Sequence, residues 1–230
     1  LKQQLREEDG FRMKTEETVG LIRQYHPRGI FICNPNNPTG QYLTRKEMEA
    51  ILDASKDSLV ILDEAYISFV NDAWSSLEMI AEGNLLVLRT MTKDYALAGL
   101  RLGYAIAHPQ IISNLRRIFP PWSVNVVAQR AGVIALKDDK YMEKSRSILG
   151  EARSFLITEL ASLGLPPLLS QANFFLVKVG DAREFRLALL KRGILVRDCS
   201  SFGLPNYVRI AARTVPDCRR LVAAIKEIVK

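Results

Sequence analysis

Short runs of apolar residues alternate with amphipathic segments through the first half of the chain. Four runs have the length of β-strands: Ile30–Cys33, Leu59–Leu62, Leu85–Leu88 and Leu102–Ala107. After the first run, Thr44 and Glu47 have the spacing of a capping box, which predicts the start of a helix. Met48, Ile51 and Leu52 would form the apolar face of that helix. Apolar strands separated by helical segments favour a buried, mostly parallel sheet with flanking helices.

The second half of the chain has a different pattern. A long helix is predicted from Asp139 to Leu163, ended by Gly164 and Pro166-Pro167. Its apolar face would hold Tyr141, Ile148, Leu149, Ala152, Phe155, Leu156, Leu160 and Leu163. The elements expected next are strand Phe174–Val179, a helix from Asp181 to Arg192, strands Ile194–Arg197 and Tyr207–Ala211, and a helix capped by Thr214 with Asp217. We therefore expect an α/β protein with two domains. Residues 1–144 would hold the mostly parallel sheet, and residues 145–230 a small α+β domain.

Composition places the chain among ordinary globular proteins. Of its 230 residues, 48% are hydrophobic and 25% are charged. No apolar run approaches the roughly 18 residues that are needed to span a bilayer. The net charge is +7, from 32 basic and 25 acidic residues, but the basic residues are scattered. A nucleic-acid interface would need a basic stripe or stacking aromatic residues, so the sequence predicts neither a membrane protein nor a nucleic-acid-binding protein.

The few cysteines and histidines do not form a recognisable site. Cys33, Cys199 and Cys218 lack CxxC spacing, which argues against a disulfide framework or a zinc site and fits a reducing cytoplasm. His26 and His108 are isolated, and we expect both to be structural. The chain begins with Leu1 and not with Met, so we expect either a processed protein or a piece of a longer one.

Three successive predicted strands end in polar residues. The first is followed by Asn34-Pro35-Asn36-Asn37-Pro38-Thr39-Gly40, the second by Asp63-Glu64-Ala65-Tyr66, and the third by Thr90-Met91-Thr92-Lys93, with Gly99-Leu100-Arg101 further on. Each segment alone has an ordinary explanation: a turn, a capping aspartate or a surface lysine. Open α/β sheets bind ligands beyond the carboxyl ends of their strands, so the three segments together predict a binding site.

The side chains in this set suit a carbonyl cofactor that carries a phosphate. Lys93 would supply the amine and Asp63 the acidic partner of the ring nitrogen, both of which pyridoxal phosphate needs. An ionised carboxylate favours a protonated ring nitrogen, and the ring then accepts electrons from the substrate's α-carbon. Arg101 would hold the phosphate together with Thr90 and Thr92, since a guanidinium can bind phosphate through two hydrogen bonds.

These motifs resemble those of the fold-type I aminotransferases, and in particular the histidinol-phosphate aminotransferase branch. The resemblance covers nearly the whole chain and rests on Asn34–Gly40, Asp63–Tyr66 and Thr92-Lys93 with Gly99–Tyr104. It implies pyridoxal 5′-phosphate as the cofactor and a homodimer with its site at the subunit interface. It also implies that Lys93 forms the internal aldimine and shuttles the proton.

The same resemblance implies roles for the remaining site residues. Asp63 would pair with the pyridinium nitrogen, and Asn37 and Tyr66 would hydrogen-bond the 3′-oxygen of the cofactor. The phosphate would be bound by Thr90, Thr92 and Arg101. Arg209, within Tyr207-Val208-Arg209-Ile210, would bind the α-carboxylate of the substrate.

Other residues resemble the L-threonine-O-3-phosphate decarboxylases of cobalamin biosynthesis. Lys93 is followed by Asp94-Tyr95-Ala96, where the aminotransferases typically have Ala-Phe-Gly. The segment Arg197–Phe202 and the additional arginine Arg213 also look like the decarboxylases, and Arg213 near Arg209 would suit a doubly anionic substrate. The expected function is therefore decarboxylation of a small phosphorylated amino acid. The alternative is a histidinol-phosphate aminotransferase or a related transaminase.

The resemblance has one departure. Family members have an N-terminal portion, with a Gly-rich loop and an aromatic residue that stacks on the cofactor, and no counterpart precedes Asn34. We therefore expect an incomplete sheet and weaker binding of the cofactor, and a non-catalytic fragment is a further alternative. A regulator built on the same fold would need a DNA-binding segment, and an interaction module would have no need for Lys93, Asp63 and Arg101 together.

Overall fold

The computed structural model describes residues 1–229, apart from the side chain of Glu82, and divides the chain into two compact units. Unit 1 comprises Leu1–Asn36 and Gln41–Asp139. Unit 2 comprises the short segment Asn37–Gly40 and the residues from Lys140 onward. The two units divide between residues 139 and 140, at the start of the long helix. The sequence analysis predicts a boundary five residues later, between 144 and 145.

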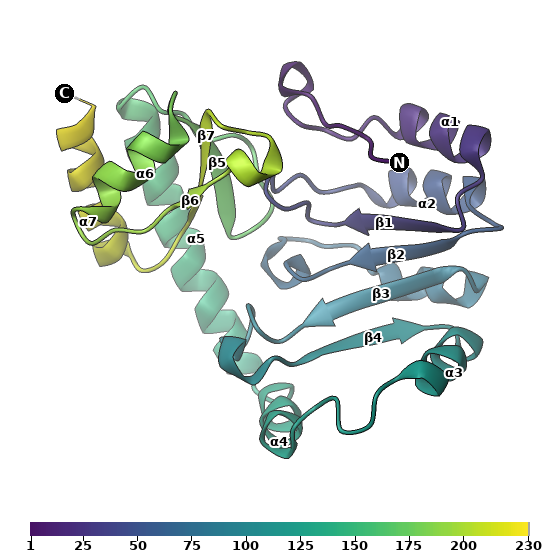
Figure 1. Ribbon diagram of the computed structural model, residues 1–230. Helices are drawn as coiled ribbons and strands as arrows, with labels where there is room; N and C mark the ends of the chain where they lie inside the picture. The colour runs from purple at the N-terminus through teal and green to yellow at the C-terminus, as the bar shows by residue number, and fades with distance from the viewer. Residues whose placement is uncertain (230) are drawn as a thin grey trace. The chain divides into compact units, whose positions relative to one another are not determined.

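Unit 1 contains a four-stranded sheet in the order β1-β2-β3-β4 (Figure 1). The strands are β1 (Gly29–Cys33), β2 (Leu59–Asp63), β3 (Leu85–Thr90) and β4 (Gly103–Ala107). The first three strands are parallel and β4 runs antiparallel to β3, which confirms the prediction of a mostly parallel sheet. Cys33 lies opposite Asp63, and Asp63 lies opposite Leu88, so the carboxyl ends of three strands meet at one edge of the sheet.

Two of the helices of unit 1 pack on one face of this sheet. The unit contains α1 (Thr15–Tyr25), α2 (Arg45–Ala54), α3 (Pro109–Ile118) and α4 (Val126–Ala135), with short 3-10 helices at Glu7–Asp9, Ile67–Phe69, Ser76–Glu82 and Ala98–Leu100. Ile22 of α1 and Met48, Ile51 and Leu52 of α2 share a buried core with alternate residues of the strands. The apolar face predicted for α2 is therefore the face that packs against the sheet.

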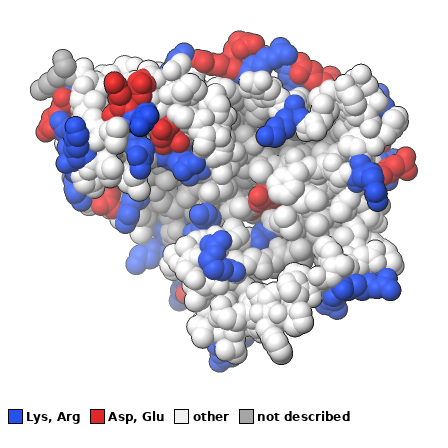
Figure 2. Space-filling view, viewed as in Figure 1, with Lys and Arg blue, Asp and Glu red and all other residues white. Residues whose placement is uncertain are grey.

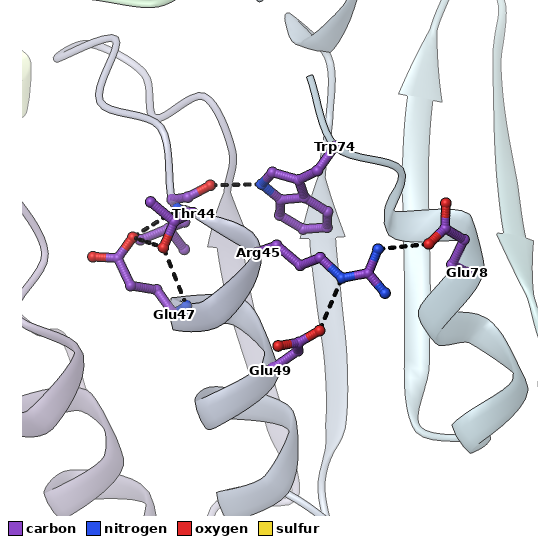
Figure 3. A network of polar contacts seen from close by, with 7 residues as sticks. Thr44, Arg45, Glu47, Glu49, Trp74 and Glu78 are labelled. Atoms are coloured by element: carbon purple, nitrogen blue, oxygen red, sulfur yellow. Dashed lines mark hydrogen bonds and ion pairs between the residues drawn. The ribbon is translucent and has the colours of Figure 1, made fainter. Parts of the chain in front are cut away.

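The start of α2 has the capping box that the sequence predicts (Figure 3). The hydroxyl of Thr44 accepts a hydrogen bond from the backbone N–H of Glu47 at 3.3 Å, and the carboxylate of Glu47 accepts one from the backbone N–H of Thr44 at 2.6 Å. Arg45 forms ion pairs with Glu49 at 2.9 Å and Glu78 at 2.6 Å. These exposed pairs contribute little to stability on their own.

Replacing Thr44 with alanine is expected to destabilise unit 1 by about 1 kcal/mol, because the substitution removes the side-chain acceptor of the cap. Urea denaturation would measure the loss. Thr158→Ala is a matched control, since Thr158 lies exposed within a helix and its hydroxyl donates to the carbonyl of Ser154 at 3.2 Å. An equal loss of unfolding free energy in the two variants would contradict a capping role for Thr44.

Unit 2 is an antiparallel sheet covered by helices on one face. Its strands are β5 (Phe174–Lys178), β6 (Arg197–Asp198) and β7 (Tyr207–Ala211), in the order β5-β7-β6. Its helices are α5 (Asp139–Ser162), α6 (Ala182–Leu190) and α7 (Val215–Ile228), with a 3-10 turn at Ser200–Phe202. The core joins Phe175 and Ile210 of the sheet to Leu156, Leu189 and Val222 of the helices. This architecture confirms the predicted α+β fold.

The predicted apolar face of α5 was wrong in its first half. Ala152, Leu156 and Leu160 are fully buried, but Tyr141 and Ile148 are each 39% exposed. The core of unit 2 packs along the part of the helix that begins at Leu149, so periodicity alone extended the buried face too far. No helix among residues 1–229 combines the length and the apolar character needed to cross a membrane.

The strand predicted at Ile194–Arg197 was also misplaced, since β6 contains only Arg197 and Asp198. The backbone N–H of Ile194 bonds to the carbonyl of Leu189 at 3.0 Å, so this residue completes the turn that ends α6. Gly193 makes the turn possible, because its φ of +71° is unfavourable for residues with a Cβ atom. The apolar run is explained by the burial of Val196 in the core of unit 2.

Candidate functional site

Most of the predicted cofactor-binding residues lie at the carboxyl ends of β2 and β3 in unit 1. Asp63 ends β2, Thr90 ends β3, and Lys93 follows three residues later with an exposed side chain. Side chains alternate between the two faces of a strand, and Leu62 and Val87 point into the core with α1 and α2. Asp63 and Thr90 therefore lie on the other face of the sheet.

The carboxylate of Asp63 is partly buried and held by its own backbone. One oxygen, Oδ1, accepts a hydrogen bond from the backbone N–H of Ala65 at 2.9 Å. The other oxygen, Oδ2, lies 4.0 Å from the sulfur of Cys33, the residue opposite Asp63 in the sheet. The side chain is thus fixed at the strand end, in a position to accept a hydrogen bond or pair with a cation. Tyr66 follows at the start of the short 3-10 helix Ile67–Phe69 and is partly buried.

Two threonine hydroxyls lie together between β3 and Lys93. The hydroxyls of Thr90 and Thr92 are 2.9 Å apart, and the backbone N–H of Thr92 donates to the hydroxyl of Thr90 at 3.2 Å. Thr90 also donates to the backbone carbonyl of Leu102 at 3.2 Å. This turn therefore attaches the segment that carries Lys93 to the start of β4.

Arg101 lies on the connection that leads into β4. Its backbone is left-handed, with a φ of +56°, and its exposed guanidinium donates to the carbonyl of Ala98 at 3.1 Å. Gly103 lies two residues later, and a Cβ atom there would come within 2.9 Å of the carbonyl oxygen of Arg89. Only glycine lets β4 begin this close to β3, which places Arg101 beside the end of the strand that carries Thr90.

Unit 2 brings together two other predicted residues that are far apart in the sequence. The Nη1 of Arg209, on β7, donates a hydrogen bond to Oδ1 of Asn37. The guanidinium carbon of Arg209 lies 4.7 Å from the centre of the Phe174 ring, a cation–π contact. Gly40 has a φ of +72° and no room for a Cβ atom beside Ser170, so the Asn37–Gly40 segment packs closely on this unit.

Arg213 has a different environment from Arg209. Its side chain is 79% exposed and forms an ion pair with Asp217 at 3.4 Å, at the start of α7. With Arg220 it lines a pocket of about 280 Å³ beside the connection that follows α6. The structure thus pairs Arg213 with Asp217 and Arg209 with Asn37.

Residue types alone did not identify three further side chains around the strand ends: Cys33, Glu64 and Arg89. Burial, and secondarily the charge of Asp63, raises the pKa of the Cys33 thiol to about 11. Its position before Asn34 was visible in the sequence, but its proximity to Asp63 depends on the register between β1 and β2.

Cys33 is therefore expected to resist alkylation. At pH 8 a pKa near 11 lowers the thiolate fraction about a hundredfold relative to an ordinary thiol. Iodoacetamide labelling followed by mass spectrometry would measure the rate, with the urea-unfolded chain as the reference. Asp63→Asn should speed the labelling, since it removes the negative charge that opposes ionisation. Equally rapid labelling of the folded and unfolded chains would contradict this environment.

Comparison with known proteins assigns the family. The family model "Aminotransferase class I and II" matches residues 2–225. The chain belongs to this family. A histidinol-phosphate aminotransferase of Moorella thermoacetica is 39% identical over 208 residues, which are 88% of this chain and 54% of that protein. This chain thus spans about half the length of the curated relatives that it matches.

Solved structures of the family have the same fold. The histidinol-phosphate aminotransferase of Clostridium acetobutylicum matches with a TM-score of 0.89 and 27% identity, covering 96% of this chain and 69% of that one. The L-threonine-O-3-phosphate decarboxylase of Porphyromonas gingivalis matches with a TM-score of 0.84 and 27% identity, covering 94% and 69%. The fold is therefore shared by members named for two different reactions.

Pyridoxal 5′-phosphate is the cofactor of this family. The histidinol-phosphate aminotransferase of Sinorhizobium meliloti, solved in complex with it, matches with a TM-score of 0.85 and 26% identity, covering 95% of this chain and 62% of that one. The residues of unit 1 fit the cofactor, because they include an exposed amine (Lys93), a fixed carboxylate (Asp63), paired hydroxyls (Thr90 and Thr92) and an exposed guanidinium (Arg101).

Proposed function

We propose that this chain is part of a pyridoxal-phosphate-dependent aminotransferase that acts on a small phosphorylated amino compound of the histidinol phosphate type. The observation that carries the proposal is the set of side chains at the ends of β2 and β3, where Asp63, Thr90 and Lys93 follow adjacent strands. Two relatives at 39% and 36% identity are both named histidinol-phosphate aminotransferase, which supports the same reaction.

Each residue would have a separate role. Asp63 would bind the ring nitrogen through its carboxylate, and Asn37 and Tyr66 would bind the 3′-oxygen. Thr90, Thr92 and Arg101 would bind the phosphate. The cofactor, when bound, supplies a ring that accepts the electron pair left at the substrate's α-carbon. Lys93 Nζ would hold the cofactor covalently and then move the α-proton. Arg209 would bind the α-carboxylate, or the corresponding polar group, of the substrate or acceptor.

Decarboxylation of L-threonine-O-3-phosphate is the second candidate. The similarity to the decarboxylase structure at a TM-score of 0.84 favours it, as does the Arg197–Phe202 segment. The Asp94-Tyr95-Ala96 segment after Lys93 and the additional arginine Arg213 were the other sequence arguments for it. Arg213 is mostly exposed and forms an ion pair with Asp217, a contact that adds no support for the decarboxylase.

Parallel assays on the purified chain loaded with pyridoxal phosphate would test the proposal. One assay would supply histidinol phosphate with 2-oxoglutarate and measure glutamate, and the other would supply L-threonine-O-3-phosphate and measure carbon dioxide. Glutamate formation would support transamination. Release of carbon dioxide without glutamate formation would contradict transamination and support decarboxylation as the reaction. If sodium borohydride fixes no cofactor to the chain, these 230 residues alone do not form the cofactor site.

A homodimer in a reducing, cytoplasmic compartment is part of the same proposal. The segment 118–136 exposes more than half of each of eight apolar side chains: Ile118, Phe119, Trp122, Val126, Val127, Val133, Ile134 and Leu136. The surface over α4, at the bottom of Figure 2, is mostly uncharged. Apolar surface of this extent supports a subunit contact, and the three free cysteines fit reducing conditions. Sedimentation of the chain as a monomer would contradict the dimer.

A further inference from the structure

A second carboxylate lies directly behind the one proposed to bind the cofactor. Glu64 follows Asp63 at the end of β2 and is only 2% exposed. Its backbone N–H donates to the carbonyl of Leu88 on β3 at 2.8 Å, so the polypeptide still follows the sheet at this point. Side chains of consecutive extended residues point to opposite faces. Glu64 therefore lies on the core side of the sheet, and Asp63 on the side of the proposed site.

Glu64 forms an ion pair with Arg89, the residue just before Thr90. Arg89 Nε lies 2.8 Å from Glu64 Oε2, and the side chains of Arg89 and Glu64 are 25% and 1% exposed. Arg89 is opposite Tyr104 of β4 in the sheet. Burial lowers the pKa of Arg89, but Glu64 and Tyr104 outweigh burial and the pKa is raised overall. The guanidinium is thus charged, and the pair connects β2 to β3.

The carboxylate of Glu64 also lies close enough to Tyr42 for its charge to affect that phenol. Oε1 of Glu64 is buried and has no hydrogen-bond partner among the described residues. Burial raises the pKa of Tyr42 to about 12, and the charge of Glu64 contributes to the increase. Tyr42 follows the Asn34–Gly40 segment by two residues. Glu64 thus lies close to Tyr42, which comes after the first polar segment, and to Arg89, which comes just before the third.

Stability alone is a poor explanation for this arrangement. A buried ion pair gains little net free energy over apolar residues of the same volume, because both charges lose their hydration. A buried carboxylate with one unpaired oxygen is less favourable still. What the pair does provide is a fixed geometry, since Glu64 and Arg89 each adjoin a residue of the proposed site.

We propose that Glu64 is a positioning residue of the cofactor site, acting through Arg89 to hold Asp63 and the Thr90–Lys93 turn in one fixed arrangement. This inference rests on the proposed function, because Glu64 can orient Asp63 and Lys93 toward pyridoxal phosphate only if this site binds that cofactor. Glu64 and Arg89 themselves lie on the opposite face of the sheet from Asp63 and Thr90, so they would contact neither substrate nor cofactor.

Hydrogen exchange of the chain without cofactor tests the structural part of this inference. Glu64→Gln keeps the shape of the side chain and removes its charge. We expect amide exchange to rise about tenfold in residues 63–66 and 88–93 but not in α1 or α2, as local opening predicts. Glu227→Gln is the matched control, because it breaks an exposed pair with Arg192 of similar length, 3.0 Å. Unchanged exchange, or an equal rise throughout unit 1, would overturn the proposal.

Cofactor binding tests the functional part. Glu64→Gln is expected to weaken pyridoxal phosphate binding about tenfold, and to shift the pH midpoint of the bound cofactor's visible absorbance, because Asp63 would be less well oriented. A purely structural role would lower the unfolding temperature and leave that midpoint in place. Glu64→Asp, which keeps the charge on a shorter side chain, should give smaller changes of the same kind, and it replaces Glu64→Gln if that variant fails to fold.

The outcomes separate this inference from the proposed function. If the parent chain binds the cofactor and Glu64→Gln changes neither the pH midpoint nor the amide exchange, the role of Glu64 is overturned and the proposed function stands. A parent chain that fixes no cofactor would overturn the proposed function of these 230 residues. In that case, the exchange pattern of the cofactor-free chain still decides whether Glu64 holds the two strand ends together.

Discussion

Replacing Lys93 with alanine is expected to abolish covalent attachment of pyridoxal phosphate and to lower kcat at least about 10³-fold, because the side chain is proposed to be both the attachment point and the proton carrier. Lys93 is exposed at the end of a turn fixed by Thr90 and Thr92, so the substitution should leave the fold intact. Borohydride reduction followed by peptide mass spectrometry would locate the attached cofactor, and circular dichroism would check folding.

Lys56→Ala provides the matched control for this experiment. Lys56 is also exposed but lies in the turn between α2 and β2, at the opposite end of that strand from Asp63. Its replacement should change neither cofactor attachment nor activity. Cofactor found on another lysine in the Lys93→Ala chain, with activity retained, would show that the attachment site has been misassigned.

The second large effect is expected at Arg209. Arg209→Ala should lower kcat/KM for the amino substrate roughly 10- to 150-fold. This corresponds to the loss of about 1.5–3 kcal/mol of stabilisation from a charge-assisted hydrogen bond. Most of the effect should appear in KM, since the proposed contact forms when the substrate binds. Steady-state kinetics with varied substrate and acceptor would measure it.

Two further variants make the Arg209 experiment specific. Arg209→Lys keeps the charge but loses the planar donor geometry, so it should recover only part of the affinity. Arg183→Ala removes an exposed arginine from α6 in the same unit and should have no effect. Unaltered kinetics in Arg209→Ala would mean that the polar group of the substrate, or the α-carboxylate of the acceptor, binds elsewhere, and the contact with Asn37 would then have a structural role only.

Local sequence patterns determined much of the fold. The capping box of Thr44 and Glu47 and the strand Tyr207–Ala211 were both predicted correctly from a few neighbouring residues. Such features depend on interactions within one turn or one strand, which the sequence displays directly. The burial of Tyr141 and Ile148 was predicted wrongly, because periodicity shows which residues share a face but not how far the neighbouring core extends.

The chemistry of the candidate site could likewise be predicted from residue types, since the polar segments after three strands contain an amine, a carboxylate and a guanidinium in Lys93, Asp63 and Arg101. Their roles remain proposals. The environment of each side chain depended on strand register and packing, which join residues distant in the sequence. Register brings Cys33 to Asp63, packing pairs Arg209 with Asn37, and the alternation of side chains separates Asp63 from Glu64. The sequence by itself thus determined which chemical groups are present and the local elements that carry them. Only the tertiary structure decided which groups are paired, buried or exposed, because these properties arise from contacts between separate segments of the chain.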